Sequence, residues 1–359
     1  MKPETSEVSL LNHKHIVSTA ILIIASAALF ALAGLFQPAF EAVMNETLFI
    51  SWHIVFEFAS ILVSFAVFVS SYYTYNQAKN LRSVFMGAVF LFTGLVDMFH
   101  TLSYKGMPPF FMVNCCANRA TIFWVISRFF GTAGIAVSTF IRNGGRKSKP
   151  VGRFVFFAAP LLLSLVIFIT ATYYPSFFPE MYIEGVGLTP VKVFIEYVII
   201  ALMLFSAMRF ISEYGKTLEY MNILLAQGMI ISIFSELTFV MYFSPYDIHN
   251  FLGHIYKVIA FYLIFKGIFI ISVQKPYMEL ALAQSELKNY AENLDRLINE
   301  RTQQIKEINQ KLLDDLEYAR DIQLSMLPPR LPDNNEISFA ASYFPAERVG
   351  GDFYNIFNI

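Results

Sequence analysis

The chain of 359 residues is strongly apolar, with 56% hydrophobic and only 15% charged residues. Soluble globular proteins carry about 25% charged residues, so the composition argues against a wholly soluble protein. The formal net charge of −1 gives no indication of nucleic-acid binding, and no nucleic-acid partner is expected. The two cysteines, Cys115 and Cys116, are adjacent, which strains any disulfide between them and excludes a disulfide or zinc framework.

Charged residues are scarce from about Ile16 to Val273 and frequent after Lys275. A transmembrane helix needs about 20 apolar residues to cross a hydrocarbon core of roughly 30 Å. Eight segments are long enough, and breakers or turn formers separate them. They are Ile16–Phe36, Leu48–Tyr72, Ser83–Ser103, Ala120–Ile141, Val151–Tyr174, Pro190–Ile211, Tyr220–Phe243 and Phe251–Val273. We therefore expect an all-α polytopic membrane bundle of about eight transmembrane helices over residues 16–273, surrounded by membrane lipid and preceded by a short segment, residues 1–15.

Lysine and arginine are distributed unequally between the two sides of this topology. Two of them, Lys105 and Arg119, lie on one side, and eleven lie on the other. The eleven are Lys2, Lys14, Lys79, Arg82, Arg142, Arg146, Lys147, Lys149, Arg153, Arg209 and Lys216. Because short cytoplasmic loops carry the excess of basic residues, we expect both termini to be cytoplasmic.

Ionisable residues inside the spans fall at a similar depth, most of them toward the outer ends of the helices. The spacings His53–Glu57 and His254–Lys257 place each pair on one face of its helix. The candidate ligand-sensing residues are His53, Glu57, Asp97, His100, Arg128, Glu196, Glu236, His254 and Lys257. Ionisable groups are costly in lipid, so this layer needs either partners or a function.

Two interpretations of the layer remain open. In the first, its residues form interhelical ion pairs and hydrogen bonds that fix how the helices pack. In the second, they line an outward-facing polar pocket that binds a small ligand, a metal ion or a haem, because histidines and carboxylates on facing helices form metal sites in bundles. An intramembrane proton path or a transporter is a further alternative.

Three runs of the membrane region resemble the bacterial membrane-associated sensor domain of the third type. They are Tyr75-Asn76 through Asn80, the run from Gly94 to Met107, and Ala120 through Trp124 to Arg128. The most specific part is Asp97-x-x-His100-x-x-x-Tyr104-Lys105-Gly106-Met107. The resemblance covers roughly residues 15–273 and implies a sensor in a bacterial cytoplasmic (inner) membrane. Domains of this family precede histidine kinases, diguanylate cyclases and phosphatases.

After the last span the sequence predicts a long helix, residues 274–327, with no glycine or proline from Glu279 onward. Apolar residues repeat every seven positions at Leu280, Leu287 and Leu294, and again, after a four-residue offset, at Ile298, Ile305, Leu312, Ala319 and Met326. A seven-residue repeat is typical of a coiled coil, and a four-residue insertion is a stutter. We expect a parallel homodimeric coiled coil in the cytoplasm; the alternative is a single solvated helix.

Pro328-Pro329 ends this helix, and residues 328–359 have the pattern of extended chain. Apolar residues alternate from Ile337 to Tyr343, Gly350-Gly351 predicts a turn, and the run from Asp352 to Phe357 predicts a second strand. A lone hairpin is marginally stable in water. We therefore expect the first β-hairpin of an α/β domain of which this chain contains only the start.

Short runs in this region resemble the opening of the sporulation stage II protein E group, metal-dependent serine/threonine phosphatases of the PPM type. They are Ala319–Gln323, Met326-Leu327-Pro328, Pro345-Ala346 and Val349–Tyr354. The resemblance implies that Asp352 is a ligand to a manganese or magnesium pair, and that a phosphorylated anti-sigma-factor antagonist is the substrate. The family's other metal-ligand aspartates lie outside this chain, so we expect the chain by itself to be inactive.

Together these patterns favour a membrane sensor that regulates a C-terminal cytoplasmic phosphatase. One alternative is a sensor for another output, such as a histidine kinase, although no histidine follows His254. The other alternative is a stand-alone membrane transporter, which leaves the long helix unexplained.

Overall fold

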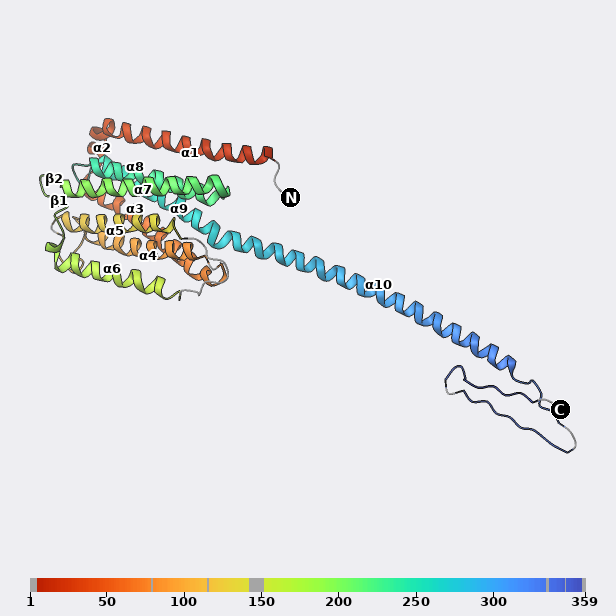
Figure 1. Cartoon of the computed structure of the whole chain (residues 1–359). Coiled ribbons are helices and arrows are strands. Elements are labelled where there is room, and N and C mark those ends of the chain that lie inside the picture. The colour runs from red at the N-terminus through yellow and green to blue at the C-terminus, as the bar shows by residue number, and fades with distance from the viewer. Residues whose placement is uncertain are drawn as a thin grey trace. The chain divides into compact units, whose positions relative to one another are not determined.

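All eight predicted spans are helices in the computed structural model of the chain (Figure 1). The structure describes residues 5–78, 80–114, 116–141, 152–333, 336–345 and 347–356, and it divides into two units, residues 1–279 and 280–359. The spans are α1 (Thr5–Ala33), α3 (Glu46–Ala78), α4 (Leu81–Leu102), α5 (Asn118–Ser138), α6 (Val155–Tyr173), α7 (Pro190–Thr217), α8 (Tyr220–Met241) and α9 (Ile248–Phe269). Between the first two, the 3₁₀ turn η1 (Gly34–Phe36) and the short helix α2 (Gln37–Val43) reverse the chain.

Polar side chains fix where three of the long helices begin. The side chain of Asn80 accepts a hydrogen bond from the backbone N–H of Ser83 at the start of α4. Thr189 and Asp247 cap α7 and α9 in the same way. Such caps satisfy backbone donors that have no partner inside the helix. They therefore set the register of helices that carry buried charged residues.

Six helices form a closed ring in unit 1. Around the ring, α3 packs against α4, α4 against α5, α5 against α7, α7 against α8, α8 against α9, and α9 against α3. Helix α6 packs outside the ring on α4, and α1 packs outside it on α8 and α9 (Figure 1). The inside of the ring is therefore shielded from lipid, which permits polar side chains there.

Glycines allow the closest helix contacts within the ring. A Cβ atom at Gly253 of α9 would lie 2.5 Å from the Phe239 ring and 2.6 Å from the Thr238 hydroxyl, both on α8. At Gly131 of α5 it would lie 2.8 Å from the hydroxyl of Thr93 on α4. Small residues at helix interfaces let backbones approach in membrane bundles.

Loops close one end of the ring, which we call the hairpin end; its described residues are 103–114, 116–117, 174–189 and 242–247. Within the second loop, after the 3₁₀ turn η2 (Pro175–Phe177), the strands β1 (Tyr182–Ile183) and β2 (Gly187–Leu188) pair antiparallel. Glu184, at their turn, is 2.9 Å from the Lys105 ammonium and accepts a hydrogen bond from the backbone N–H of Ala117. These two hydrogen bonds lower the pKa of the Glu184 carboxyl.

At the other end of the ring, α9 passes without a break into the π-helical turn η3 (Ile270–Gln274) and then into α10 (Lys275–Met326). The predicted long helix is thus present, with 52 residues. No residue of α10 is buried, and Leu287 in its seven-residue repeat is 70% exposed. A coiled-coil partner is not part of the structure, so the coiled coil stays a prediction.

The two strands predicted after α10 are not confirmed. In the described residues of 328–356, pairing is limited to a bridge between Asp333 and Ser338. A two-stranded hairpin without a larger sheet or a packed helix is marginal, which accounts for the difference. The predicted turn is nevertheless held, because the Gln323 side chain donates to the carbonyl of Gly350 (2.7 Å) and accepts from its N–H (3.0 Å).

Candidate functional site

Each of the six ring helices contributes at least one charged residue to a buried layer inside the ring. The residues are Glu57 on α3, Asp97 on α4, Arg128 on α5, Lys192 and Glu196 on α7, Glu236 on α8, and Lys257 on α9. All are between 0% and 6% exposed. By contrast, α6 and the apolar part of α1, which lie outside the ring, have no charged residue.

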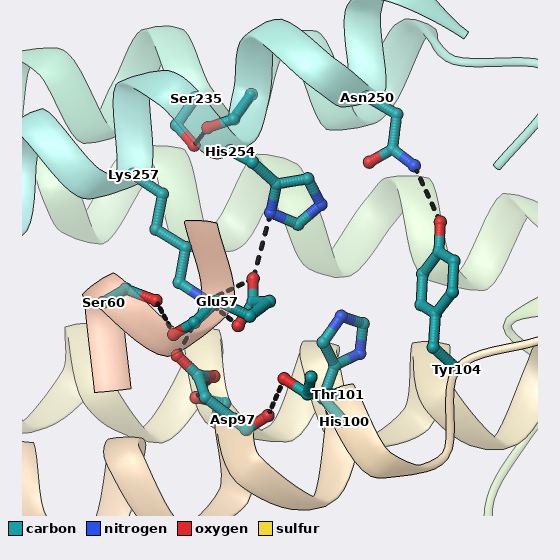
Figure 2. Close-up of polar contacts among 12 residues, drawn as sticks. Glu57, Ser60, Asp97, His100, Thr101, Tyr104, Ser235, Asn250, His254 and Lys257 are labelled. Carbon is teal, nitrogen blue, oxygen red and sulfur yellow. Dashed lines mark hydrogen bonds and ion pairs between the residues drawn. The ribbon is translucent and has the colours of Figure 1, made fainter. Parts of the chain in front are cut away.

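The centre of the layer is a network of four charges from four helices, and Figure 2 shows Glu57, Asp97 and Lys257 of this network. The Lys257 ammonium is 2.7 Å from Glu57 Oε2 and 2.8 Å from Asp97 Oδ2. Arg128 Nη2 is 2.8 Å from the same oxygen of Asp97. Ser127 donates a further hydrogen bond of 2.5 Å to Asp97 Oδ1. Two carboxylates and two cations therefore neutralise each other, and each carboxylate has more than one partner.

Aromatic rings enclose these cations. The Arg128 guanidinium lies 4.7 Å from the ring centre of Trp124 and 4.9 Å from that of Phe261. The Lys257 ammonium lies 4.8 Å from the Trp124 ring. Cations over aromatic faces are stabilised electrostatically, and most strongly where water is excluded. The network is therefore fixed in place by packing as well as by charge.

Three histidines gather beside this network, toward the hairpin end. The ring of His53 lies 4.7 Å from that of His254 and 5.4 Å from that of His100, and it stacks on Tyr104 at 3.9 Å. His254 Nδ1 is 3.0 Å from Glu57 Oε1. Figure 2 shows the imidazoles of His100 and His254 extending into the same space, with the Glu57 carboxylate at its edge.

Several nitrogens in this group have no hydrogen-bond partner among the described residues. They are both ring nitrogens of His53, Nε2 of His100 and Nε1 of Trp124, and Nδ1 of His254 lacks hydrogen-bond geometry despite its contact with Glu57. Buried polar groups without partners are rare in native proteins. A small cavity of about 30 Å³ adjoins the group, lined by His100, Tyr104, Trp124, Asn250 and His254 among others.

A second charged group occupies the α7–α8 side of the ring. Lys192 Nζ is 3.1 Å from Glu196 Oε1 and donates a hydrogen bond of 2.5 Å to the carbonyl of Phe239. Glu236 interacts electrostatically with Glu196, Lys192 and Arg128. This group therefore interacts electrostatically with Arg128 of the central network.

The structure brings all nine predicted membrane residues into the ring interior. His53, Glu57, Asp97, His100, Arg128, His254 and Lys257 lie in or beside the central network, and Glu196 and Glu236 form the second group. Sequence reasoning missed Lys192, although its four-residue spacing from Glu196 was a usable signal. It also missed Ser127 and Trp124, because serine and tryptophan are common in membrane helices and give no sign of a site. Asp352 lies in the other unit, where it is exposed.

The ring, its apolar outer helices and its buried polar layer define a polytopic α-helical membrane protein. The model of a membrane-associated sensor domain, MASE3, matches residues 44–276, and the chain belongs to this family. The match runs from just before α3 into the first turn of α10. No curated protein and no solved structure gives a significant match. The phosphatase resemblance of the C-terminal residues is not confirmed by these comparisons.

Proposed function

We propose that the buried layer of this sensor domain is its sensing site, and that α9 and α10 transmit the signal to a PPM-type phosphatase in the bacterial cytoplasm. The domain itself is a membrane-associated sensor by family. The sensing site lies at the hairpin end, which this proposal puts outside the cytoplasm, in accord with the basic residues of the other side. Signals then cross the membrane through the helices of the ring.

The observation that carries the proposal is the continuity of α9. His254 and Lys257 on this helix contact Glu57 and Asp97 at one end of the ring. At the other end Ser272, in the π-helical turn that follows α9, hydrogen-bonds to Ser83 of α4. Single π turns inside helices are frequent at functional sites. A shift of α9 at the site is thereby coupled to the start of α10.

The exposed apolar repeat of α10 supports a homodimer. Leu280, Leu287 and Leu294 are 58%, 70% and 58% exposed in the single chain. Their seven-residue spacing matches the seam of a parallel coiled coil, in which a second copy of the same helix covers them. A rotation of α10 within such a pair is the proposed signal.

The phosphatase output rests on the sequence around the end of α10. Gln323 holds the Gly350 backbone, and a Cβ atom at Gly350 would lie only 1.9 Å from the Tyr343 hydroxyl. These contacts hold the backbone of Gly350 in place at the start of the run Gly350-Gly351-Asp352. In this run, Asp352 is the proposed ligand to manganese or magnesium. The proposed substrate is a phosphorylated anti-sigma-factor antagonist. A coding sequence that continues past residue 359 into further metal-ligand aspartates supports this output, and an unrelated domain there refutes it.

Cysteine cross-linking in membrane vesicles tests the transmission. In a variant with Cys115 and Cys116 changed to serine, Leu287→Cys should form a disulfide between two copies, whereas Asn289→Cys, two residues away and off the seam, should not. Adding Lys257→Met should change the cross-linking rate at Leu287 at least several-fold. Equal cross-linking at both positions would refute the dimer, and an unchanged rate in a folded Lys257→Met protein would refute the coupling.

A further inference from the structure

We propose that His53, Glu57 and His254 bind a divalent transition-metal ion, with His100 as a fourth ligand. The binding stands on the geometry of these residues alone. We also propose that this ion is the signal that the domain senses, and this second statement rests on the proposed function.

The three residues already lie close to a ligand set. One ligand atom from each lies within 4.8 Å of those of the other two, and all three side chains are buried. Metal–ligand distances of about 2.0–2.2 Å place the ligand atoms of a tetrahedral site roughly 3.3–3.5 Å apart. Small side-chain rotations therefore complete the site. His53 and Glu57 come from successive turns of α3 and His254 from α9, so the ion would join two helices.

The orphaned imidazole nitrogens are an independent sign of a ligand. His53 is 1% exposed, yet neither of its nitrogens has a hydrogen-bond partner in the described part of the chain. His254 Nδ1 meets Glu57 Oε1 without hydrogen-bond geometry. A metal ion accounts for one nitrogen of each ring, since it takes one lone pair from each imidazole.

His100 is oriented as a metal ligand usually is. Its Nδ1 is 2.8 Å from the backbone carbonyl of Ala120. A carbonyl oxygen only accepts, so Nδ1 carries the proton and Nε2 has a free lone pair and no partner. Ligating histidines commonly donate their other N–H to a carbonyl or carboxylate in this manner.

Ligand type identifies the class of ion. The carboxylate of the group is Glu57, and its other three members are imidazoles. Three imidazoles and one carboxylate suit zinc, copper, nickel or iron better than magnesium or calcium. The adjoining cavity of about 30 Å³ has room for about one water molecule beside the ion.

Binding of this ion would change the partners of α9. Glu57 would turn one oxygen from Lys257 to the metal, while Lys257 keeps its contact of 2.8 Å with Asp97. The helix that leads into α10 would then be held to α3 by the ion as well as by the ammonium. This is a direct way for metal occupancy to bias the position of α9.

The test uses the whole chain purified in detergent, stripped with a chelator and titrated with Zn²⁺. Elemental analysis should find about one Zn²⁺ per chain, and His53→Ala and His254→Ala should each weaken binding roughly tenfold or more. His249→Ala, on the same helix but outside the group, is the matched control and should bind as the unchanged protein does. Titration with Cu²⁺ should quench the fluorescence of Trp124, whose ring lies 5.6 Å from that of His254.

Absence of bound metal in a folded, unmodified chain overturns the inference, as does equal loss in the His249→Ala control. Circular dichroism of each variant separates loss of a ligand from loss of the fold. The cross-linking change caused by Lys257→Met does not require a metal. If it persists while no metal binds, the metal site fails and the proposed sensing and transmission stand.

Discussion

Lys257 has two charged partners in the buried layer. Its ammonium contacts carboxylates on two different helices, Glu57 of α3 and Asp97 of α4. Ion pairs away from water are costly to break from one side, because the remaining charge stays buried without a partner. Removing Lys257 is therefore expected to destabilise the protein mainly because the Glu57 carboxylate stays buried without a cation.

We expect Lys257→Met to lower the free energy of unfolding by about 3–5 kcal/mol, since Glu57 loses its ammonium partner while Asp97 keeps Arg128. The double variant Lys257→Met/Glu57→Gln should be more stable than Lys257→Met alone, because it removes the unpaired charge. Detergent-mediated unfolding followed by circular dichroism measures both.

The matched control is Lys275→Met. Lys275 pairs with Glu219 at 2.9 Å, but their side chains are 53% and 42% exposed. Exposed pairs contribute about 0–1 kcal/mol, so this variant should be nearly neutral. A loss as large as that of Lys257→Met would contradict the role given to burial.

Residue types and spacing were enough to find most of the buried charged layer. Glu57, Asp97 and Arg128 stand out because charged residues are rare in apolar spans. Their pairing was not predictable, since it depends on which helices become neighbours in the ring. Lys192 was overlooked because it lies in the first turn of α7, where a lysine is normally at the lipid headgroups.

At the scale of elements, α8 and α9 approach each other closely beside the site. Gly253 lies one residue before His254, and its α8 neighbours are Thr238 and Phe239. The position of the imidazole therefore depends on how closely the two helices approach.

We expect Gly253→Ala to destabilise the protein by about 1–3 kcal/mol, because its methyl group has no room against α8. Gly215→Ala in α7 is the control; a Cβ atom there meets nothing within 4 Å. Alanine favours a helix over glycine by about 1 kcal/mol, so this control should be neutral or stabilising. Detergent-mediated unfolding followed by circular dichroism measures both variants. Equal losses of stability in the two would contradict the close packing at Gly253.

Long elements were predictable and short ones were not. Each span has enough apolar residues to define a helix regardless of its neighbours. The strands β1 and β2 have two residues each and depend on glycines in left-handed conformations, Gly185 (φ 79°) and Gly187 (φ 101°). The signal was the sequence from Tyr182 to Leu188, in which two glycines separate apolar residues.

For the whole molecule, the proposed orientation puts the hairpin end outside the cytoplasm. In intact cells, a membrane-impermeant thiol reagent should label Val186→Cys in the β1–β2 turn and should not label Gly215→Cys near the end of α7. After the membrane is permeabilised, both should react. Labelling of Gly215→Cys alone in intact cells would show that the hairpin end faces the cytoplasm. The proposed route of the signal would then be wrong.

The closed ring has a consequence for biosynthesis. Glu57 and Asp97 enter the membrane with α3 and α4, long before the ribosome has made Lys257, which belongs to the last helix of the ring. Until α9 arrives, Glu57 has no ammonium to pair with, and an unpaired charge in hydrocarbon is costly. Nascent chains that stop before α9 should thus remain open assemblies that membrane proteases recognise, so that completion of the last helix acts as the checkpoint for maturation.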